Sequence, residues 1–319
     1  MNKKLIVICG PTASGKTKLS LKLAQKFNGV IISADSRQIY KEMNIGTDKP
    51  YLIKYLKSKR KNSLWIINGI KHFMIDIVKP NQEFTLADYQ TKVFKILKKI
   101  YQENELRTQK GKLPIVPFLV GGTGLYIQAI IDGLIIPQVA PDKKLRSELE
   151  KLNKQELFKQ LKKLDPEIIK SIDQNNKRRL IRALEVCLIT KKPFSWQRKK
   201  KPLDIKILQL GLSLPRQKLY QKIDQRVDKM IKEGLVEETK KLIAKYDPEL
   251  PSMSGIGYKE IIRYLNNEIN LEEAKKLIKY RTHRLARQQI TWFHRDKRIK
   301  WCKNKKQALQ LVKKFIESN

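Results

Sequence analysis

The first 130 residues alternate between short, continuous apolar runs and longer stretches in which apolar residues recur at helical spacing. Continuous runs are typical of strands that are buried on both faces, and stripes with a helical period are typical of helices that cover such a sheet. The runs that predict strands are Leu5–Cys9, Val30–Ser33, Phe73–Val78 and Ile115–Val120. The alternation predicts an α/β fold, with a parallel sheet flanked by helices.

Two helices are predicted between these strands. Leu19, Leu23 and Phe27 recur every four residues and give the first helix one apolar stripe. Thr85 with Asp88 has the pattern of a capping box, which predicts the start of the second helix. The buried face of that helix is predicted to hold Val93, Ile96, Leu97 and Ile100.

The pattern changes near Asp142, where strand-like runs disappear. Asn153 and Asp165-Pro166 resemble helix N-caps, and apolar residues such as Leu157 and Leu161 share one helical face. We therefore predict an all-helical insertion over residues 136–196. Strand character returns over 205–210, and the rest of the chain is predicted to be mostly helical. The catalytic core would then comprise residues 1–135 and 197–319.

Composition and charge add a class of partner. The chain has 319 residues, 41% of them hydrophobic, and a formal net charge of +38, which attracts polyanions such as nucleic acids or phosphorylated substrates. Lysine is so abundant that a solvated basic surface remains an alternative. The three cysteines form no CxxC pair, and no apolar stretch approaches the roughly 20 residues of a membrane helix. We expect a cytoplasmic protein that has no membrane partner.

A phosphate-binding motif lies between the first predicted strand and the first predicted helix. Its glycines let successive backbone N–H groups point at one anion, and the helix adds its positive N-terminal end. Lys16 would bring charge to the outer phosphate, and Thr17 can offer a hydroxyl to Mg²⁺. The residues that match GxxxxGK[ST] are Gly10, Pro11, Thr12, Ala13, Ser14, Gly15, Lys16 and Thr17. The motif predicts a di- or triphosphate ligand but does not identify it, because ATPases, GTPases, kinases and other transferases share it.

Polar residues follow three of the predicted strands. Asp35 ends the second strand, at the edge where the carboxyl ends of parallel strands line a ligand crevice, and could bind Mg²⁺ or accept a proton. A turn-capping role for Asp35 remains open. Asp76 could support a metal or be a buried, hydrogen-bonded carboxylate. Gly121-Gly122 would allow close approach to a ligand and place Thr123 at a helix start, or form a plain turn.

These motifs together resemble the bacterial tRNA dimethylallyltransferase (tRNA isopentenyltransferase) family. The order and spacing match from Leu5 to Trp292. The matching segments are Gly10–Thr17, Ala34–Tyr40, Gly46–Pro50, His72–Asp76, Val120–Tyr126 and Gly255–Glu260. The resemblance implies a P-loop NTPase-like fold that holds dimethylallyl diphosphate instead of a nucleotide, with Mg²⁺ as cofactor. It implies transfer of the dimethylallyl group to N6 of the adenine 3′ to the anticodon, in tRNAs that read codons starting with U.

The resemblance also implies roles for individual residues. Asp35 matches the general base, and Arg226 matches an arginine that contacts the diphosphate. Thr17 is expected to take part in catalysis and to hold Mg²⁺, with Asp76 as an expected further contact through water. For Arg226, pairing with Asp224 or Asp228 on the helix surface remains an alternative.

The partner implied by the resemblance is the tRNA anticodon stem-loop, bound by a monomer with the helical insertion contacting tRNA. Arg178 and Arg182 lie four residues apart, on one face of a predicted helix. A basic helix is also compatible with a solvated face. The residues expected to contact tRNA are Asp35, Ser36, Arg37, Gln38, Thr123, Arg146, Lys177, Arg178, Arg179, Arg182, Gly257, Tyr258, Arg284 and Arg287.

Two other functions are compatible with a P-loop. A small-molecule or nucleotide kinase would turn over ATP and use the insertion as a lid. An NTPase switch that binds nucleic acid would show RNA affinity that depends on nucleotide, without group transfer. Neither accounts for the resemblance along the whole chain.

Overall fold

The computed structural model describes residues 3–52, 57–61, 64–137, 139–197 and 199–318. The chain divides into two compact units. We call Met1–Gln128 with Asp204–Asn319 the sheet unit, and Ala129–Leu203 the helical unit. No helix among the described residues is long and apolar enough to cross a membrane.

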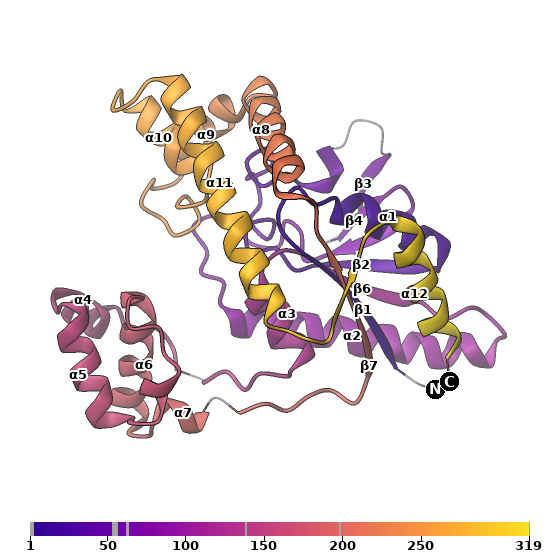
Figure 1. Cartoon of the computed structure of the whole chain (residues 1–319), viewed down its shortest axis with the longest axis horizontal. Coiled ribbons are helices and arrows are strands. Elements are labelled where there is room, and N and C mark those ends of the chain that lie inside the picture. Colours follow the sequence, from indigo (N-terminus) through magenta and orange to yellow (C-terminus); the bar gives the residue numbers. More distant parts are fainter. Residues whose placement is uncertain (1–2, 53–56, 62–63, 138, 198, 319) are drawn as a thin grey trace. The chain divides into compact units, whose positions relative to one another are not determined.

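The sheet unit contains a mixed sheet with strand order β3-β4-β5-β2-β6-β1-β7-β8, eight strands among the described residues (Figure 1). The strands from β5 to β8 in this order are parallel, and β3 and β4 pair antiparallel beside β5. The parallel strands are β1 (Lys4–Cys9), β2 (Gly29–Ser33), β5 (Ile70–Phe73), β6 (Val116–Val120), β7 (Lys206–Leu212) and β8 (Ile299–Cys302). The strands predicted at 5–9, 30–33, 115–120 and 205–210 are confirmed.

The third predicted strand is wrong in its position. We expected Phe73–Val78, but β5 ends at Phe73. Met74 and Asp76 adopt positive φ angles of 64° and 56°, and this left-handed conformation cannot continue a strand. β8 and the hairpin of β3 (Ser58–Lys61) and β4 (Leu64–Ile67) were not predicted, and β3 carries only polar side chains.

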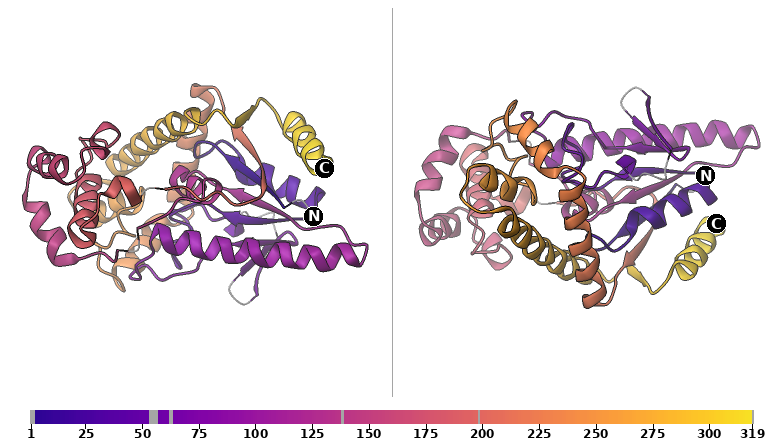
Figure 2. Two further views of the ribbon diagram at one scale, coloured as in Figure 1. Left: turned by 90° about the horizontal axis from the view of Figure 1, so that it is seen from below. Right: turned by 90° about the horizontal axis from the view of Figure 1, so that it is seen from above.

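Helices cover both faces of the sheet (Figure 2). On one face, α1 (Lys16–Lys26) and α12 (Lys305–Glu317) pack against apolar residues of β1, β2, β6 and β7. On the other face lies α2 (Leu86–Gln109), and Thr85 caps it with the predicted capping box. The hydroxyl of Tyr89 in α2 donates a 2.9 Å hydrogen bond to the carbonyl of Ser33, which ties the helix to the end of β2.

A group of helices with its own apolar core completes the sheet unit. In Figure 1 the long helix α11 runs beside α8 and α10, and α9 packs against these two helices. The bounds are α8 (Arg216–Lys232), α9 (Leu235–Ile243), α10 (Tyr258–Leu265) and α11 (Leu271–His294). α8 and α11 therefore share a core, and both extend toward the P-loop with the side chains described below.

The helical unit has a separate small core, built from leucines of its helices. Its elements are the end of α3 (Gly124–Ile131), α4 (Lys143–Lys151), α5 (Lys154–Leu164), α6 (Lys177–Thr190) and α7 (Phe194–Gln197). The predicted N-cap at Asn153 is confirmed, with a capping box. Asp165 accepts from the N–H of Ile168, as a cap does, but only a short 3₁₀ turn, Ile168–Lys170, follows it.

The two connections of the helical unit pair with each other. The N–H of Ile135 donates to the carbonyl of Lys199 at 2.8 Å, and the N–H of Lys201 donates to that of Gly133 at 2.8 Å. Lys200 also forms an ion pair with the buried Asp132, at 3.0 Å. These contacts place the connecting segments within the unit, beyond the 136–196 of the predicted insertion.

Candidate active site

The segment between β1 and α1 folds as an anion-binding loop. Gly10, Ala13 and Gly15 adopt positive φ angles of 137°, 60° and 93°. A side chain at position 10 would place its Cβ 2.3 Å from the carbonyl oxygen of Leu212, so the loop needs glycine there. The loop leads directly into the N-terminus of α1, so backbone N–H groups and the helix dipole point at the same place.

Lys16 follows the loop as the first residue of α1. Its Nζ donates to the carbonyl of Pro11 at 2.6 Å. Burial lowers the pKa of Lys16 to about 8, against the opposing attraction of Asp35. A phosphate oxygen would replace a neutral carbonyl by a charged partner, which would stabilise the ammonium form.

Two hydroxyl groups of the loop are also available to a ligand. The Oγ of Ser14 is buried and has no hydrogen-bond partner among the described residues. A buried polar group without a partner costs free energy, and a bound phosphate would supply the missing acceptor. Thr17 is half-buried in the first turn of α1, directly after the loop.

Arg226 reaches the P-loop from α8. Its NH1 donates to Oγ1 of Thr12 at 2.9 Å and lies 3.2 Å from the carboxylate of Asp48. Arg226 does not pair with Asp224 or Asp228 on the helix surface, which was the alternative. Asp224 lies 2.9 Å from Nε2 of His283, and Asp228 pairs with Lys279 at 2.8 Å. The structure therefore brings Arg226 to the phosphate-binding loop.

Asp48 was missed as a site residue, although it lies in the segment Gly46–Pro50 that supports the resemblance. Its carboxylate is half exposed and faces Arg226. The loop that carries it is held by Glu238, which accepts from the backbone N–H groups of Asn44, Ile45 and Gly46 at 2.9–3.2 Å. No local pattern could reveal this contact, because Glu238 comes from α9.

Asp35 both caps a turn and keeps one oxygen available. It follows β2, and its Oδ1 accepts from the N–H groups of Arg37 at 2.8 Å and Gln38 at 3.4 Å. The other carboxylate oxygen accepts no hydrogen bond from the described part of the chain. The structure therefore has the turn-capping role of Asp35, and the turn leaves the second carboxylate oxygen available.

The turn after β6 supports Asp35 from the side. The N–H of Thr123 donates to the carbonyl of Ala34, and the N–H of Ser36 donates to Oγ1 of Thr123, both at 3.1 Å. A Cβ at Gly121 would lie 2.0 Å from the oxygen of Ala34, so this approach requires glycine. Thr123 therefore contacts the segment that carries Asp35, as its predicted position at a helix start suggested.

Arg37 and Gln38, which we expected to contact tRNA, form hydrogen bonds that hold loops of the site together. The guanidinium of Arg37 donates to the carbonyls of Pro251 and Ser252, at 2.8 and 3.1 Å. The amide of Gln38 donates to the carbonyls of Thr47 and Asp48, and its oxygen accepts from Ser33 at 3.0 Å. Both side chains are thus committed to positioning loops.

The expected metal role of Asp76 has no support in the structure. Lys49 forms an ion pair with one carboxylate oxygen, and Nε1 of Trp65 donates to the other at 2.8 Å. Lys49 is fully buried and Asp76 is 5% exposed. The alternative, a buried and hydrogen-bonded carboxylate, is what the structure has.

Gly257 and Tyr258, which we expected to contact tRNA, lie in the interior of the sheet unit. Tyr258 is 1% exposed, and its hydroxyl donates to Glu238 at 2.7 Å. A Cβ at Gly46 would lie only 2.5 Å from the ring of Tyr258, so the ring packs closely over this glycine. Gly257 is buried as well. Contact of these two residues with tRNA stays a prediction, which their burial does not support.

The expected basic contacts fall into two groups. Arg178, Arg179 and Arg284 are exposed, and Arg287 is exposed with one N–H bonded to the hydroxyl of Tyr220 at 2.8 Å. In the other group, Arg146 and Arg182 pair with the buried carboxylate of Glu185, and Lys177 donates to the carbonyl of Glu150. The first group is exposed to solvent, and the second group is paired within the helical unit.

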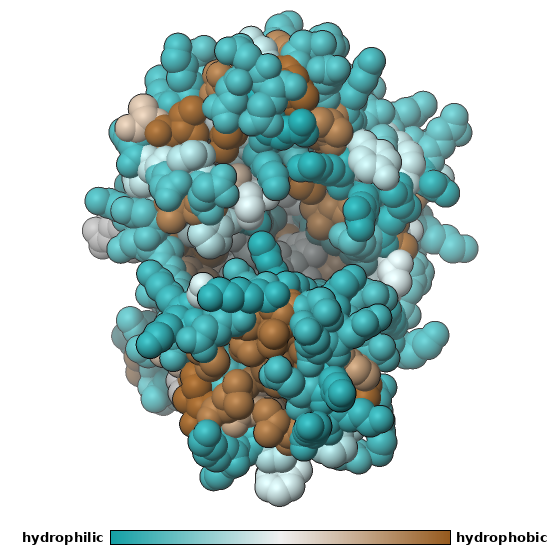
Figure 3. All heavy atoms as spheres, turned by 90° about the vertical axis from the view of Figure 1, so that its left-hand side faces the viewer, coloured by the Kyte–Doolittle hydropathy of each residue, from teal (hydrophilic) through white to brown (hydrophobic). Residues whose placement is uncertain are grey.

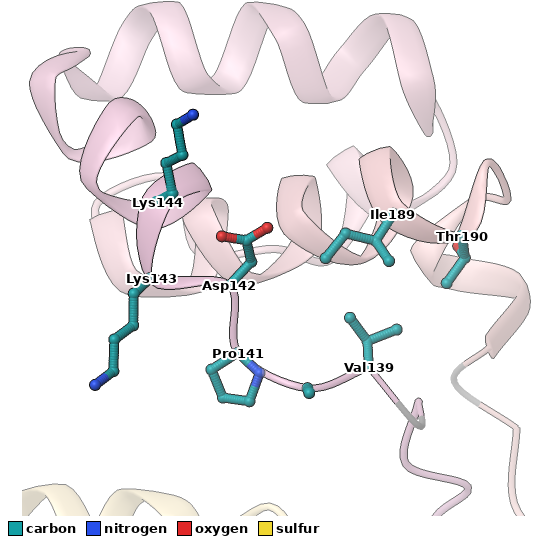
Figure 4. Close-up of a pocket in the computed structure, with 8 residues that line it drawn as sticks. Val139, Pro141, Asp142, Lys143, Lys144, Ile189 and Thr190 are labelled. Carbon is teal, nitrogen blue, oxygen red and sulfur yellow. The ribbon is translucent and has the colours of Figure 1, made fainter.

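The helical unit also has an open pocket of about 700 Å³ (Figure 4). Val139 and Ile189 point toward each other across it, and the ammonium groups of Lys143 and Lys144 point outward. Apolar residues gather on the face of this unit in Figure 3, among polar ones. The large apolar side chains exposed on the unit are Ile135, Leu164, Ile189 and Trp196.

A P-loop closed by a lysine and an arginine, on a parallel sheet flanked by helices, defines a P-loop enzyme that binds a di- or triphosphate. Residues 38–296 match the model of the family described as IPP transferase. The chain belongs to the IPP transferase family.

Similar proteins agree with this assignment over nearly the whole chain. The chain is 44% identical over 308 residues to the tRNA dimethylallyltransferase of Halothermothrix orenii, covering 94% of this chain and 87% of that protein. It is 42% identical to that of Carboxydothermus hydrogenoformans, covering 99% and 97%.

Solved structures show the same fold. The tRNA isopentenylpyrophosphate transferase of Bacillus halodurans superimposes with a TM-score of 0.67 at 35% identity, covering 98% of this chain and 95% of that one. A eukaryotic dimethylallyltransferase acting on tRNA superimposes with a TM-score of 0.72 at 30% identity, covering 91% and 69%.

Proposed function

We propose that this chain transfers the dimethylallyl group from dimethylallyl diphosphate to the N6 amine of an adenine in tRNA, and releases diphosphate. The adenine is the one 3′ to the anticodon, in tRNAs that read codons starting with U. The observation that carries the proposal is the pairing of a phosphate-binding loop with Asp35, whose charge acts on Lys16 and whose second oxygen has no partner in the described structure. The names of the similar proteins support the same activity.

On the donor side, the bond between the allylic carbon and the bridging oxygen breaks, and negative charge accumulates on the departing diphosphate. The loop amides, Lys16 and Arg226 lie where they can stabilise that charge. Arg226 is held by a hydroxyl and by a half-exposed carboxylate, so it can exchange these partners for phosphate oxygens.

On the acceptor side, the adenine amine is a weak nucleophile. A carboxylate that accepts its hydrogen raises its nucleophilicity and takes the proton as the new N–C bond forms. The unpartnered oxygen of Asp35 supplies this acceptor, while the turn fixes the other oxygen. The adenine must leave its stack in the anticodon loop to reach the carboxylate.

We propose Mg²⁺ as the cofactor, held by the hydroxyl of Thr17 and by oxygens of the donor. The fit is supported by the place of Thr17 at the start of α1, next to the loop. Bound Mg²⁺ would neutralise charge on the diphosphate. Asp76 does not fit this role, because Lys49 and Trp65 occupy it.

We further propose that the protein acts as a monomer in the cytoplasm on the anticodon stem-loop of tRNA. The exposed arginines on α6 and α11 support binding of an RNA backbone. A kinase function has no comparable support, since the similar proteins are named as prenyl transferases.

Mass spectrometry of tRNA incubated with the protein, Mg²⁺ and dimethylallyl diphosphate tests the proposal. We expect a mass gain of one C5H8 unit on the anticodon-loop adenine, with no requirement for ATP. Phosphorylation of a small acceptor with ATP, and no gain of mass on tRNA, would overturn the proposal in favour of a kinase.

A further inference from the structure

Gln289 of α11 joins the phosphate-binding loop to the turn after β6. Its Oε1 accepts from the backbone N–H of Thr12 at 2.8 Å, and its Nε2 donates to the carbonyl of Gly122 at 3.0 Å. The two partners lie 277 and 167 residues away along the chain. One amide thus bridges two loops that come from different strands.

Each of these loops carries one half of the site. Thr12, on the donor side, is the residue whose hydroxyl accepts from Arg226. Gly122 precedes Thr123, which accepts from the N–H of Ser36 and so supports the turn of Asp35. A continuous path of hydrogen bonds therefore runs from Arg226 through Thr12, Gln289 and the turn after β6 to the segment of Asp35.

The fit around the Gln289 amide is close. A Cβ at Gly122 would lie 2.4 Å from its Nε2, so glycine leaves the space that the amide occupies. Trp292, one turn further along α11, packs in the same way over Gly124, whose Cβ would lie 2.2 Å from its Nε1. An amide is needed because the bridge requires one acceptor and one donor in one side chain.

We propose that Gln289 is a positioning residue that sets the distance between the departing diphosphate and the base Asp35. The inference rests on the proposed function and adds to it a residue that touches neither reacting group. Transfer requires the allylic carbon and the amine to meet in one geometry, and a misplacement of about 1 Å can lower a rate by about 100-fold.

The neighbouring glutamine offers a matched control. Gln288 is exposed on the same helix, whereas Gln289 is half-buried at the bridge. Gln289→Met keeps the length of the side chain and removes both hydrogen bonds, and Gln288→Met makes the same change in solvent. We expect Gln289→Met to lower the single-turnover rate at saturating substrates by about 10- to 100-fold. We expect Gln288→Met to stay within about twofold of wild type, and tRNA affinity to be unchanged in both.

A second comparison separates positioning from mere stabilisation. If Gln289 acts by aligning Asp35, the loss from Gln289→Met should be much smaller in an Asp35→Asn background, because the aligned group is gone. A loss of the same size in both backgrounds would overturn the proposal, as would equal rates for Gln289→Met and Gln288→Met.

The affinity for inorganic diphosphate with Mg²⁺ distinguishes failure of this inference from failure of the proposed function. Losing the bridge to the Thr12 amide should weaken diphosphate binding by about 2- to 10-fold. Should the wild type transfer nothing to tRNA, the proposed function fails, and this affinity alone decides the bridge: an unchanged value in Gln289→Met overturns it.

Discussion

Asp35 in the sheet unit and Glu185 in the helical unit are both carboxylates close to arginines or lysines, but the fold uses them differently. Glu185 is fully buried and accepts four hydrogen bonds, from the side chains of Arg146 and Arg182 and from the N–H of Asp142. Asp35 is half-buried and commits one oxygen to a turn. A charge that the fold has paired stabilises the structure, and a charge left unpaired is available for chemistry.

The arginines differ in the same way. Arg146 and Arg182 contact a carboxylate that is 0% exposed, whereas Arg226 contacts a carboxylate that is 53% exposed and a single hydroxyl. Burial raises the pKa of Glu185, but hydrogen bonds from Arg146 and Arg182 outweigh it and hold the pKa below its ordinary value. The contrast predicts that changes in the two units affect different properties.

The largest effect is expected at Asp35. Asp35→Asn retains an oxygen that can cap the turn but removes the base, so the transfer rate should fall by about 10²- to 10⁴-fold. The melting temperature and tRNA affinity should change little. Single-turnover kinetics with radiolabelled donor, beside a thermal melt, measures both properties. A rate within about threefold of wild type would remove Asp35 from the mechanism.

Glu185→Gln is expected to do the reverse. It leaves two arginines without their buried partner, which should destabilise the helical unit by about 2–4 kcal/mol, less than for a wholly buried pair because the arginines are partly exposed. Faster hydrogen exchange of the α6 amides measures this effect. Exchange unchanged from wild type would show that the Glu185 cluster does not hold this unit together.

Because the pKa of Glu185 is lowered in the folded state, its contribution is present above the ordinary glutamate pKa and is lost as the pH falls through the folded value. Protection of α6 in the wild type should therefore weaken on acidification, and this dependence should be reduced in Glu185→Gln.

Exposed arginines should affect RNA binding without affecting stability. Replacing Arg178 and Arg179 by Gln should weaken tRNA binding by roughly tenfold and lower the salt slope by about 0.7–0.9 for each lost phosphate contact. Titrations at several salt concentrations measure this effect. The matched control is Lys154→Gln with Lys159→Gln, on the exposed face of α5. Equal losses from both pairs would mean that only diffuse charge matters.

The smallest effect concerns Lys16 and pH. Its pKa of about 8 means that the ammonium group is lost as the pH rises through that value. The apparent dissociation constant of the donor should therefore increase about fivefold between roughly pH 7 and pH 8.7. Lys16→Arg keeps its charge throughout this range, so its donor affinity should be flat. A flat profile in the wild type would contradict the lowered pKa.

Local patterns predicted the parts of the fold and site that depend on neighbouring residues. The capping box at Thr85, the N-cap at Asn153, the helix that follows the P-loop, and the strand that precedes Asp35 are all confirmed. Each depends on residues a few positions apart, so the sequence shows it directly. The strand predicted at 73–78 is wrong because two residues of this apolar segment adopt positive φ angles, which the apolar pattern does not reveal.

The amino-acid sequence by itself determined the position of the phosphate-binding motif and of the carboxylate that follows β2, because each lies within one contiguous segment. Only the tertiary structure decided which charges are still available. Lys49 reaches Asp76 across 27 residues, Arg146 reaches Glu185 across 39, and Arg226 reaches Thr12 across 214. Pairing at such separations depends on how strands and helices pack, and no local spacing encodes it. For this reason the ion pair of Asp76 with Lys49 and the bridge formed by Gln289 could not be predicted.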